Sequence, residues 1–132
     1  SQVNPERLNT DAAIQFLTDR ALATLSTIGP SGFIHTVAVG FTYADGVVRI
    51  ITNDGSQKVR NIERDARATV GQIDGPQWLT IAGSASIERD PDAVARAVEL
   101  YAGRYRQPSV NPTRVVIRIE PERVLGSATL LG

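Results

Sequence analysis

The dipeptide Asp45-Gly46 restricts the possible folds of this chain more than any other feature of its sequence. Aspartate followed by glycine favours a two-residue β-hairpin turn, because both residues reach the positive φ angles that such a turn requires. The segments on either side, Phe33–Tyr43 and Val47–Thr52, are rich in β-branched and aromatic residues, which favour extended strands. The sequence therefore predicts an antiparallel hairpin whose first strand is unusually long.

Four more segments have the composition of strands and extend the hairpin into a sheet: Ala21–Thr27, Ala66–Ile73, Trp78–Glu88 and Arg114–Glu120. Three short helices are expected beside them: one capped by Asn9 or Thr10, one over Ser56–Arg64, and one from Pro91 to about Arg106. Six strands that are linked mostly as hairpins predict a mainly β fold with short helices, built as a small antiparallel barrel.

The composition excludes several classes of function. Acidic and basic residues balance at 14 each in 132 residues, which argues against a nucleic-acid-binding surface. The absence of cysteine excludes disulfides and thiol chemistry, and the single histidine, His35, excludes a metal centre of several histidines. No apolar run approaches the ~20 residues that span a bilayer. We therefore expect one cytoplasmic domain over residues 1–132, with no metal, membrane or nucleic acid as partner.

The only tryptophan, Trp78, lies on the polar face of its predicted strand. Alternation places Leu79 and Ile81 on one face, whereas Trp78 shares the other face with Thr80 and Ser84. A large aromatic side chain among small polar ones is typical of a subunit interface or a ligand site. A tryptophan that is merely packed there is the alternative.

The helix that begins at Ser56 carries an unusual charge pattern. Its first turn holds Lys58 and Arg60, although the helix dipole disfavours a cation there by about 0.3–1 kcal/mol. A phosphate bound by the free N–H groups would reverse this effect, because the two cations would then share its charge. The alternative is a solvated basic helix that Val59 and Ile62 hold against the body of the protein.

Four motifs in order along the chain resemble a known family: H-T-V-A-V-G-F-T (His35–Thr42), G-S-Q-K-V-R-N (Gly55–Asn61), Q-I-D-G-P-Q-W-L (Gln72–Leu79) and Y-A-G-R-Y-R (Tyr101–Arg106). They resemble the flavin/deazaflavin oxidoreductase superfamily, which contains the pyridoxamine-phosphate-oxidase-like proteins. Within it, they are similar to the mycobacterial B group, which uses coenzyme F420, and above all to its deazaflavin-dependent biliverdin reductases. The resemblance implies a six-stranded antiparallel split β-barrel.

The resemblance also implies a homodimer with two cofactor sites between the subunits. It implies a phosphate site at the helix start formed by Lys58, Ser56, Gln57 and Asn61. The deazaflavin ring and ribityl chain would be lined by Thr52 and by His35, Thr36, Val37 and Ala38. Trp78 would come from the partner subunit to close the pocket.

The implied activity is reduction of a small conjugated molecule, with biliverdin or a similar tetrapyrrole as the first candidate acceptor. The cofactor carries the hydride, so the protein needs no catalytic triad. His35 is either a proton donor or a hydrogen-bonded ring beside the pocket. Arg104 and Arg106 either grip an acidic substrate or cofactor tail, or belong to a solvated helix end. Two other functions stay open: an FMN-dependent oxidoreductase of the pyridoxamine-phosphate-oxidase type and a non-catalytic F420 carrier.

Overall fold

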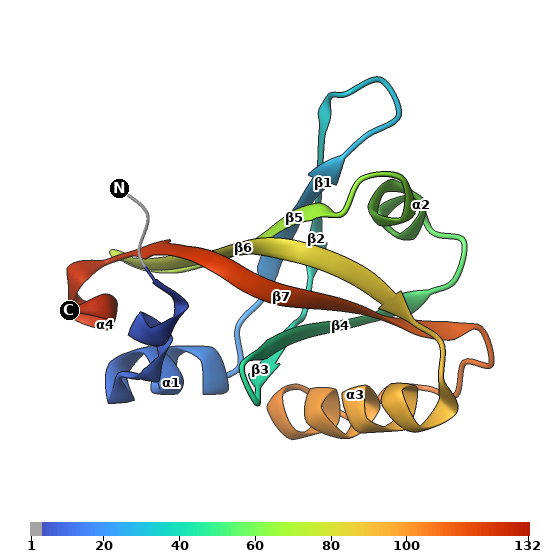
Figure 1. Cartoon of the computed structure of the whole chain (residues 1–132). Helices are drawn as coiled ribbons and strands as arrows, with labels where there is room; N and C mark the ends of the chain where they lie inside the picture. Colours follow the sequence, from blue (N-terminus) through green and yellow to red (C-terminus); the bar gives the residue numbers. More distant parts are fainter. Residues whose placement is uncertain (1–3) are drawn as a thin grey trace.

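A computed structural model describes residues 4–132 as seven strands with short helices around them (Figure 1). The strands are β1 (Ala23–Ile28), β2 (Ile34–Val39), β3 (Thr42–Ala44), β4 (Val47–Asn53), β5 (Arg67–Asp74), β6 (Gln77–Glu88) and β7 (Arg114–Gly126). The helices are η1 (Pro5–Asn9), α1 (Asp11–Thr18), α2 (Gln57–Arg64), α3 (Pro91–Arg104) and α4 (Ala128–Leu131). No helix within these described residues is long and apolar enough to cross a membrane.

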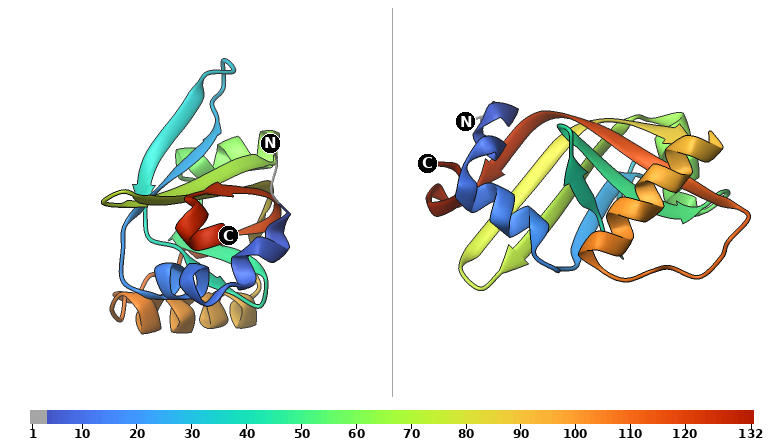
Figure 2. Two further views of the ribbon diagram at one scale, coloured as in Figure 1. Left: turned by 90° about the vertical axis from the view of Figure 1, so that its left-hand side faces the viewer. Right: turned by 90° about the horizontal axis from the view of Figure 1, so that it is seen from below.

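All seven strands belong to one antiparallel sheet with the order β2-β1-β5-β6-β7-β4-β3. The edge strands β2 and β3 follow one another in the sequence and are separated only by Gly40 and Phe41. The sheet therefore has to curl until its two edges approach each other, and Figure 2 shows this curled sheet from two further sides. The expected mainly β, antiparallel split barrel is confirmed.

The predicted hairpin at Asp45-Gly46 is confirmed. Both residues have positive φ angles, of 55° and 74°, and the register pairs Ala44 with Val47 directly across the turn. These are the angles of a primed turn, whose twist matches that of the flanking strands.

The prediction of six strands is wrong, because Phe33–Tyr43 is not one strand. The chain leaves the sheet at Gly40 and Phe41, which divides this segment into β2 and β3. The end of α3 binds both backbone groups of Phe41: its N–H donates to the Tyr105 hydroxyl at 3.1 Å, and its C=O accepts from Arg104 Nη1 at 2.6 Å. Because side chains at the end of α3 provide these hydrogen bonds, the backbone of Phe41 does not need to pair with a neighbouring strand.

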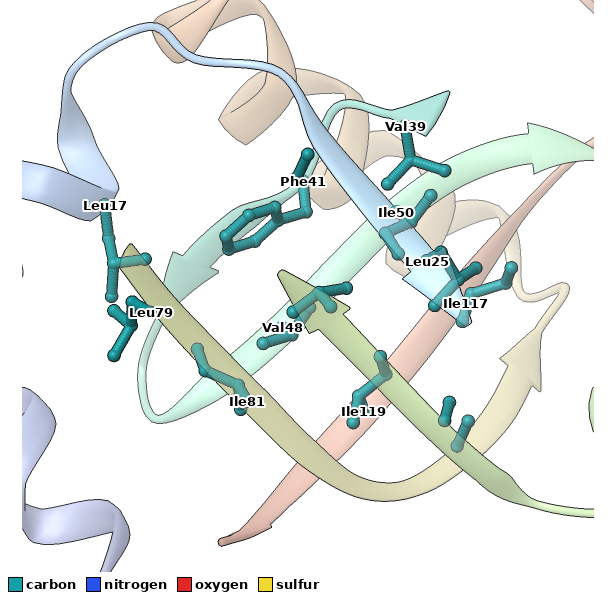
Figure 3. Close-up of a cluster of buried hydrophobic side chains, with 14 of the residues drawn as sticks. Leu17, Leu25, Val39, Phe41, Val48, Ile50, Leu79, Ile81, Ile117 and Ile119 are labelled. Atoms are coloured by element: carbon teal, nitrogen blue, oxygen red, sulfur yellow. The ribbon is translucent and has the colours of Figure 1, made fainter. Parts of the chain in front are cut away.

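The hydrophobic core fills the inner face of the curled sheet (Figure 3). Alternate residues of the central strands point into it, among them Leu25, Val48, Ile50, Leu79, Ile81, Ile117 and Ile119. Burying one such side chain contributes roughly 1.5–3 kcal/mol. The predicted alternation in β6 is confirmed, since Leu79 is 2% exposed whereas Trp78 is 41% exposed.

The helices begin where the sequence predicts. The Thr10 hydroxyl caps α1 by accepting from the N–H of Ala13 at 3.0 Å, and Asp90 caps α3 by accepting from the N–H of Ala93 at 3.1 Å, with Pro91 in the first turn. The helix α3 contacts β3, β4 and β7 and lies along one side of the barrel (Figure 1). It ends at Arg104, two residues before the expected end.

Candidate functional site

A cavity of about 330 Å³ lies at the opening of the barrel, between the end of β2 and β4. The end of β2 and the residue after it contribute Ala38, Val39 and Gly40 to its wall, and β4 contributes Ile50, Ile51, Thr52 and Asn53. Lys58 comes from α2, Tyr101 from α3, and the segment that leads into β7 adds Pro108, Asn111 and Arg114. The cavity is therefore built where the two edges of the sheet fail to meet.

Two cations line this cavity, Lys58 and Arg114, and its lining contains no acidic residue. Burial lowers the pKa of the Lys58 ammonium group, because a low-polarity environment disfavours the charged form. Within residues 4–132, this ammonium group makes no hydrogen bond and no ion pair. Arg114 already donates to the carbonyl of Ser109 at 2.8 Å. A partly buried lysine without a counter-ion suits an anionic ligand.

Ser56 occupies the N-cap position of α2, as expected, but its hydroxyl does not cap the helix. The Oγ atom is buried, and it has no hydrogen-bond partner among the described residues. Buried hydroxyl groups are nearly always hydrogen-bonded. The start of α2 therefore holds a polar atom that has no partner among residues 4–132, although Ser56 does not line the cavity.

Gln57 and Asn61 use their amides within the protein. Gln57 Nε2 donates to Asn61 Oδ1 at 2.7 Å, and Asn61 Nδ2 donates to Thr27 Oγ1 at 3.1 Å. Asn61 is fully buried, so it joins α2 to β1. Neither residue lines the cavity, and their predicted role in cofactor binding stays a prediction.

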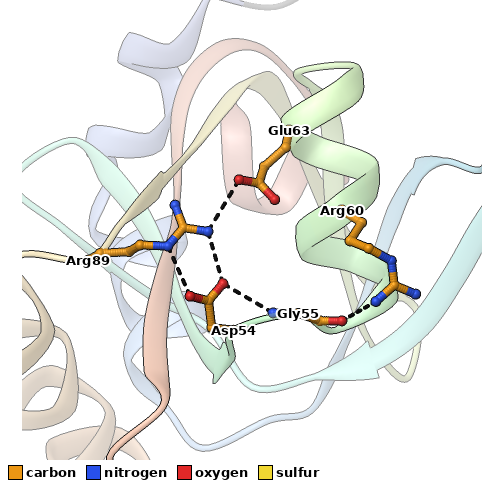
Figure 4. Close-up of polar contacts among 5 residues, drawn as sticks. All are labelled: Asp54, Gly55, Arg60, Glu63 and Arg89. Atoms are coloured by element: carbon orange, nitrogen blue, oxygen red, sulfur yellow. Dashed lines mark hydrogen bonds and ion pairs between the residues drawn. The ribbon is translucent and has the colours of Figure 1, made fainter.

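Arg60 turns away from the cavity and binds the start of its own helix. It donates to the Gly55 carbonyl and, at 2.5 Å, to Gln57 Oε1. Figure 4 shows it on one side of the turn before α2, with Asp54 on the other side. Lys58 is thus the cation of the first helical turn that reaches the cavity.

An ion-pair cluster holds the turn before α2 (Figure 4). Arg89 donates to both carboxylate oxygens of Asp54, at 2.9 and 3.0 Å, and to Glu63 at 3.2 Å. Asp54 also accepts from the N–H of Gly55 at 3.1 Å. The hydrogen bond from Arg89 is the main reason why the pKa of Asp54 is lowered. These contacts link the turn to the segment between β6 and α3.

The remaining residues predicted near the deazaflavin ring divide into two groups. Thr52 and Ala38 line the cavity, whereas His35, Thr36 and Val37 do not. Thr36 points outward and hydrogen-bonds to Ser26 Oγ at 3.0 Å, and Val37 packs against the core. His35 Nδ1 is buried and has no partner among residues 4–132.

Trp78 lies outside this cavity. It lines a separate, apolar cavity of about 430 Å³ on the outer face of the sheet, together with Leu22, Ala23, Thr24, Gly71, Gln72, Ile73 and Thr80. One chain therefore does not bring Trp78 and Lys58 together. This separation agrees with a tryptophan that serves the site of another subunit, which stays a prediction.

The sequence did not predict most of the cavity lining, and the residues it missed include Tyr101, Asn111 and Arg114. Arg114 is opposite Asn53 in the pairing of β4 with β7, and the Asn111 side chain donates to that of Asn53. The pairing of β4 with β7 places Asn111 and Arg114 near Lys58, whereas Tyr101 comes from α3. The signal that could have found Arg114 is its position as a cation at the beginning of a strand.

Comparison with known proteins agrees with this architecture. The family model for pyridoxamine 5'-phosphate oxidase matches residues 10–128. The F420H(2)-dependent biliverdin reductase of Mycobacterium tuberculosis (strain CDC 1551 / Oshkosh) is 46% identical over 133 residues, which cover 99% of this chain and 97% of that protein.

Two solved structures are also similar. The conserved hypothetical protein Rv2991 from Mycobacterium tuberculosis superposes with a TM-score of 0.79 at 28% identity, covering 89% of this chain and 83% of that one. An F420 reductase superposes with a TM-score of 0.72 at 26% identity, covering 84% of this chain and 94% of that one. The chain belongs to the pyridoxamine 5'-phosphate oxidase family.

Proposed function

We propose that this protein is a coenzyme F420-dependent reductase that transfers a hydride to a conjugated acceptor, with biliverdin or a similar tetrapyrrole as the first candidate. The observation that carries the proposal is the partly buried Lys58, which has no counter-ion among residues 4–132 and lies in a cavity whose lining has no acidic residue. The 46% identity to an F420H(2)-dependent biliverdin reductase supports the choice of cofactor and acceptor.

The donors at the cavity fit the phosphate group of this cofactor. The Lys58 ammonium group supplies a positive charge and Arg114 adds a second cation. Ser56 is not part of the cavity lining, and its hydroxyl, which has no partner among residues 4–132, would add a neutral donor at the start of α2. Charge-assisted hydrogen bonds of this kind are about twice as strong as neutral ones. Gln57 and Asn61 would act by holding the helix start in position, because their amides bind one another.

Thr52 and Ala38 would line the ring-binding part of the cavity. When bound, the reduced deazaflavin supplies the hydride, and the protein contributes orientation and charge. The proton comes from water or from His35, whose Nδ1 is free of partners within the described residues. Because His35 does not line the cavity, we assign proton donation mainly to water and give His35 a minor role.

We further propose a homodimer in which Trp78 closes the site of the partner subunit. The outer face of the sheet exposes two large apolar side chains beside Trp78, which is itself 41% exposed: Leu22 at 63% and Ile73 at 77%. An exposed apolar group of this size favours association. The single domain over residues 1–132 and the cytoplasmic location stay predictions.

Titration with F420 and FMN at equal concentrations tests the proposed function. We expect F420 to bind, with a decrease in its fluorescence on binding, and FMN to bind more weakly. FMN is the relevant competitor because its terminal phosphate suits the same donors and because the family model describes a pyridoxamine 5'-phosphate oxidase. Tight binding of FMN without binding of F420 would replace the proposal by the FMN-dependent alternative. Binding of F420 without turnover of any acceptor would indicate that the protein is a non-catalytic F420 carrier.

A further inference from the structure

The last residues of α3 form a polar cluster that the proposed reaction does not use. Arg104 is only 8% exposed, and its guanidinium group donates to the Asp19 carbonyl at 3.0 Å, the Phe41 carbonyl at 2.6 Å and Gln72 Oε1 at 2.7 Å. All three acceptors are uncharged. Within residues 4–132 no carboxylate pairs with this cation. Neither prediction for Arg104 describes it: the side chain is buried, so it is not part of a solvated helix end, and it donates to groups inside the protein rather than to an acidic ligand.

Burying a cation with no opposite charge beside it costs free energy, because the charged group loses its hydration. Burial lowers the pKa of the Arg104 side chain, and a well-packed apolar side chain of similar volume is often neutral or stabilising in such a position. An arginine offers something that an apolar residue lacks, a rigid fork of donors that reaches several carbonyls at once. Arg104 therefore fixes the positions of the Asp19 and Phe41 carbonyls relative to α3.

Tyr105 acts on the same segment. Its hydroxyl accepts from the Phe41 N–H at 3.1 Å and donates to the Ala21 carbonyl at 2.6 Å. Its ring stacks on Tyr101, with 4.8 Å between the ring centroids and an interplanar angle of 28°. Together, Arg104 and Tyr105 bind both backbone groups of Phe41.

The residue before Phe41 is part of the cavity wall. Gly40 lines the cavity together with Tyr101, and it lies directly against the stacked tyrosines. A Cβ atom on Gly40 would be 3.1 Å from the Tyr105 ring and 3.2 Å from the Tyr101 ring. The end of α3 therefore determines how far the end of β2 lies from Lys58 and β4 across the opening.

We propose that Arg104 and Tyr105 are positioning residues, which hold the Gly40–Phe41 link and thereby set the geometry of the cofactor cavity. The inference rests on the proposed function, since it assumes that this cavity takes the cofactor. Neither side chain lines the cavity, so both act through the backbone of the link.

The test compares Tyr105→Phe, Arg104→Lys and Arg104→Gln with the control Arg96→Gln. Arg96 is on the same helix but forms only exposed ion pairs with Asp45 and Glu99, which contribute little. For each variant we would measure the dissociation constant for F420 by fluorescence, the melting temperature, and kcat and KM for reduced F420. Tyr105→Phe removes one oxygen atom and keeps the ring, so it remains informative even where an Arg104 variant fails to fold.

We expect Tyr105→Phe and Arg104→Lys to raise the dissociation constant and KM by about 2–13-fold, the range for a lost hydrogen bond. The value of kcat at saturating cofactor should stay close to that of the wild type, because the reacting groups are untouched. A purely structural role would lower the melting temperature and leave the dissociation constant of the folded protein at the control value, which would overturn the proposal.

Cofactor binding by the wild-type protein distinguishes failure of the positioning role from failure of the proposed function. If the wild type binds F420 and the Tyr105→Phe and Arg96→Gln variants bind it equally well, only the positioning role fails. If the wild type binds FMN instead, the same comparison is made with FMN and tests the same geometry. If it binds neither, the cavity is not a cofactor site and both proposals fail.

Discussion

Arg114 lies directly opposite Asn53 in the antiparallel pairing of β4 with β7, and both residues line the cavity that Lys58 reaches from α2. A strand pairing between distant parts of the chain thus brings a second cation to the first. Arg114 already donates to the Ser109 carbonyl, whereas Lys58 has no such partner within residues 4–132. The two cations should therefore contribute unequally to the binding of an anion.

Lys58→Ala should weaken binding of F420 by about 1.5–3 kcal/mol, the range for hydrogen bonds to charged groups. Arg114→Gln should weaken it less, by about 0.5–1.5 kcal/mol. Arg60→Gln removes a cation from the same helical turn and serves as the matched control, because its side chain binds Gly55 and Gln57 instead. Fluorescence titrations would measure all three. Equal dissociation constants for Lys58→Ala and Arg60→Gln would refute the assignment of Lys58.

Ser56→Ala should weaken cofactor binding without destabilising the fold. Removing a serine N-cap normally costs about 1 kcal/mol, but the Ser56 hydroxyl makes no capping hydrogen bond and is buried without a partner in the described part of the chain. Its removal should leave the free energy of unfolding unchanged or raise it. Urea denaturation and cofactor titration would check both parts. A clear loss of stability with an unchanged dissociation constant would show that Ser56 is only a cap.

As the pH is raised, the affinity for F420 should begin to fall at a lower pH than it would if Lys58 had the usual pKa of a lysine. Burial lowers the pKa of Lys58 in the free protein, whereas a bound anion favours the charged form and raises it. Binding is therefore strongest below the pKa of the free protein and weakens as the pH rises through it. The ratio of dissociation constants for wild type and Lys58→Ala, measured at several pH values, cancels the titration of the cofactor. A ratio that stays constant to the usual pKa of lysine would contradict the assignment.

Trp78→Ala should weaken cofactor binding although Trp78 lies outside the Lys58 cavity of its own chain. The expected reason is that Trp78 closes the site of a second subunit. Light scattering should give twice the 14.2 kDa of one chain for the wild type at micromolar concentration. A wild-type monomer of 14.2 kDa that still binds F420, or a Trp78→Ala variant that binds it as tightly as the wild type, would exclude the shared site.

Local features of the fold could be predicted from the sequence. The turn at Asp45-Gly46 depends on two adjacent residues, the cap of α1 on Thr10 and Ala13, and the alternation in β6 on the period of an extended strand. Each of these follows from chemistry within a few residues. The prediction that Lys58 lies at an anion site also rested on a local feature, a cation in the first turn of a helix, where the helix dipole disfavours positive charge.

Long-range contacts account for what could not be predicted. The break at Gly40 and Phe41 depends on Arg104 and Tyr105, which are remote in the sequence. Arg114 reaches the cavity only because β7 pairs with β4. The uncapped helix start was also unexpected, because the sequence offers a residue suited to capping but does not show whether its hydroxyl meets an N–H group.

The most direct test of the account is a single-turnover measurement with reduced F420 and biliverdin under anaerobic conditions. We predict that the protein oxidises the reduced cofactor while a bilirubin-like absorbance grows in proportion, and that His35→Gln slows this by less than the ~10²–10⁴-fold expected for loss of a general acid. Quinones or other enones that react while biliverdin does not would keep the reductase and change its acceptor. No oxidation of reduced F420 with any of these acceptors, by a protein that binds the cofactor, would contradict the proposed reductase.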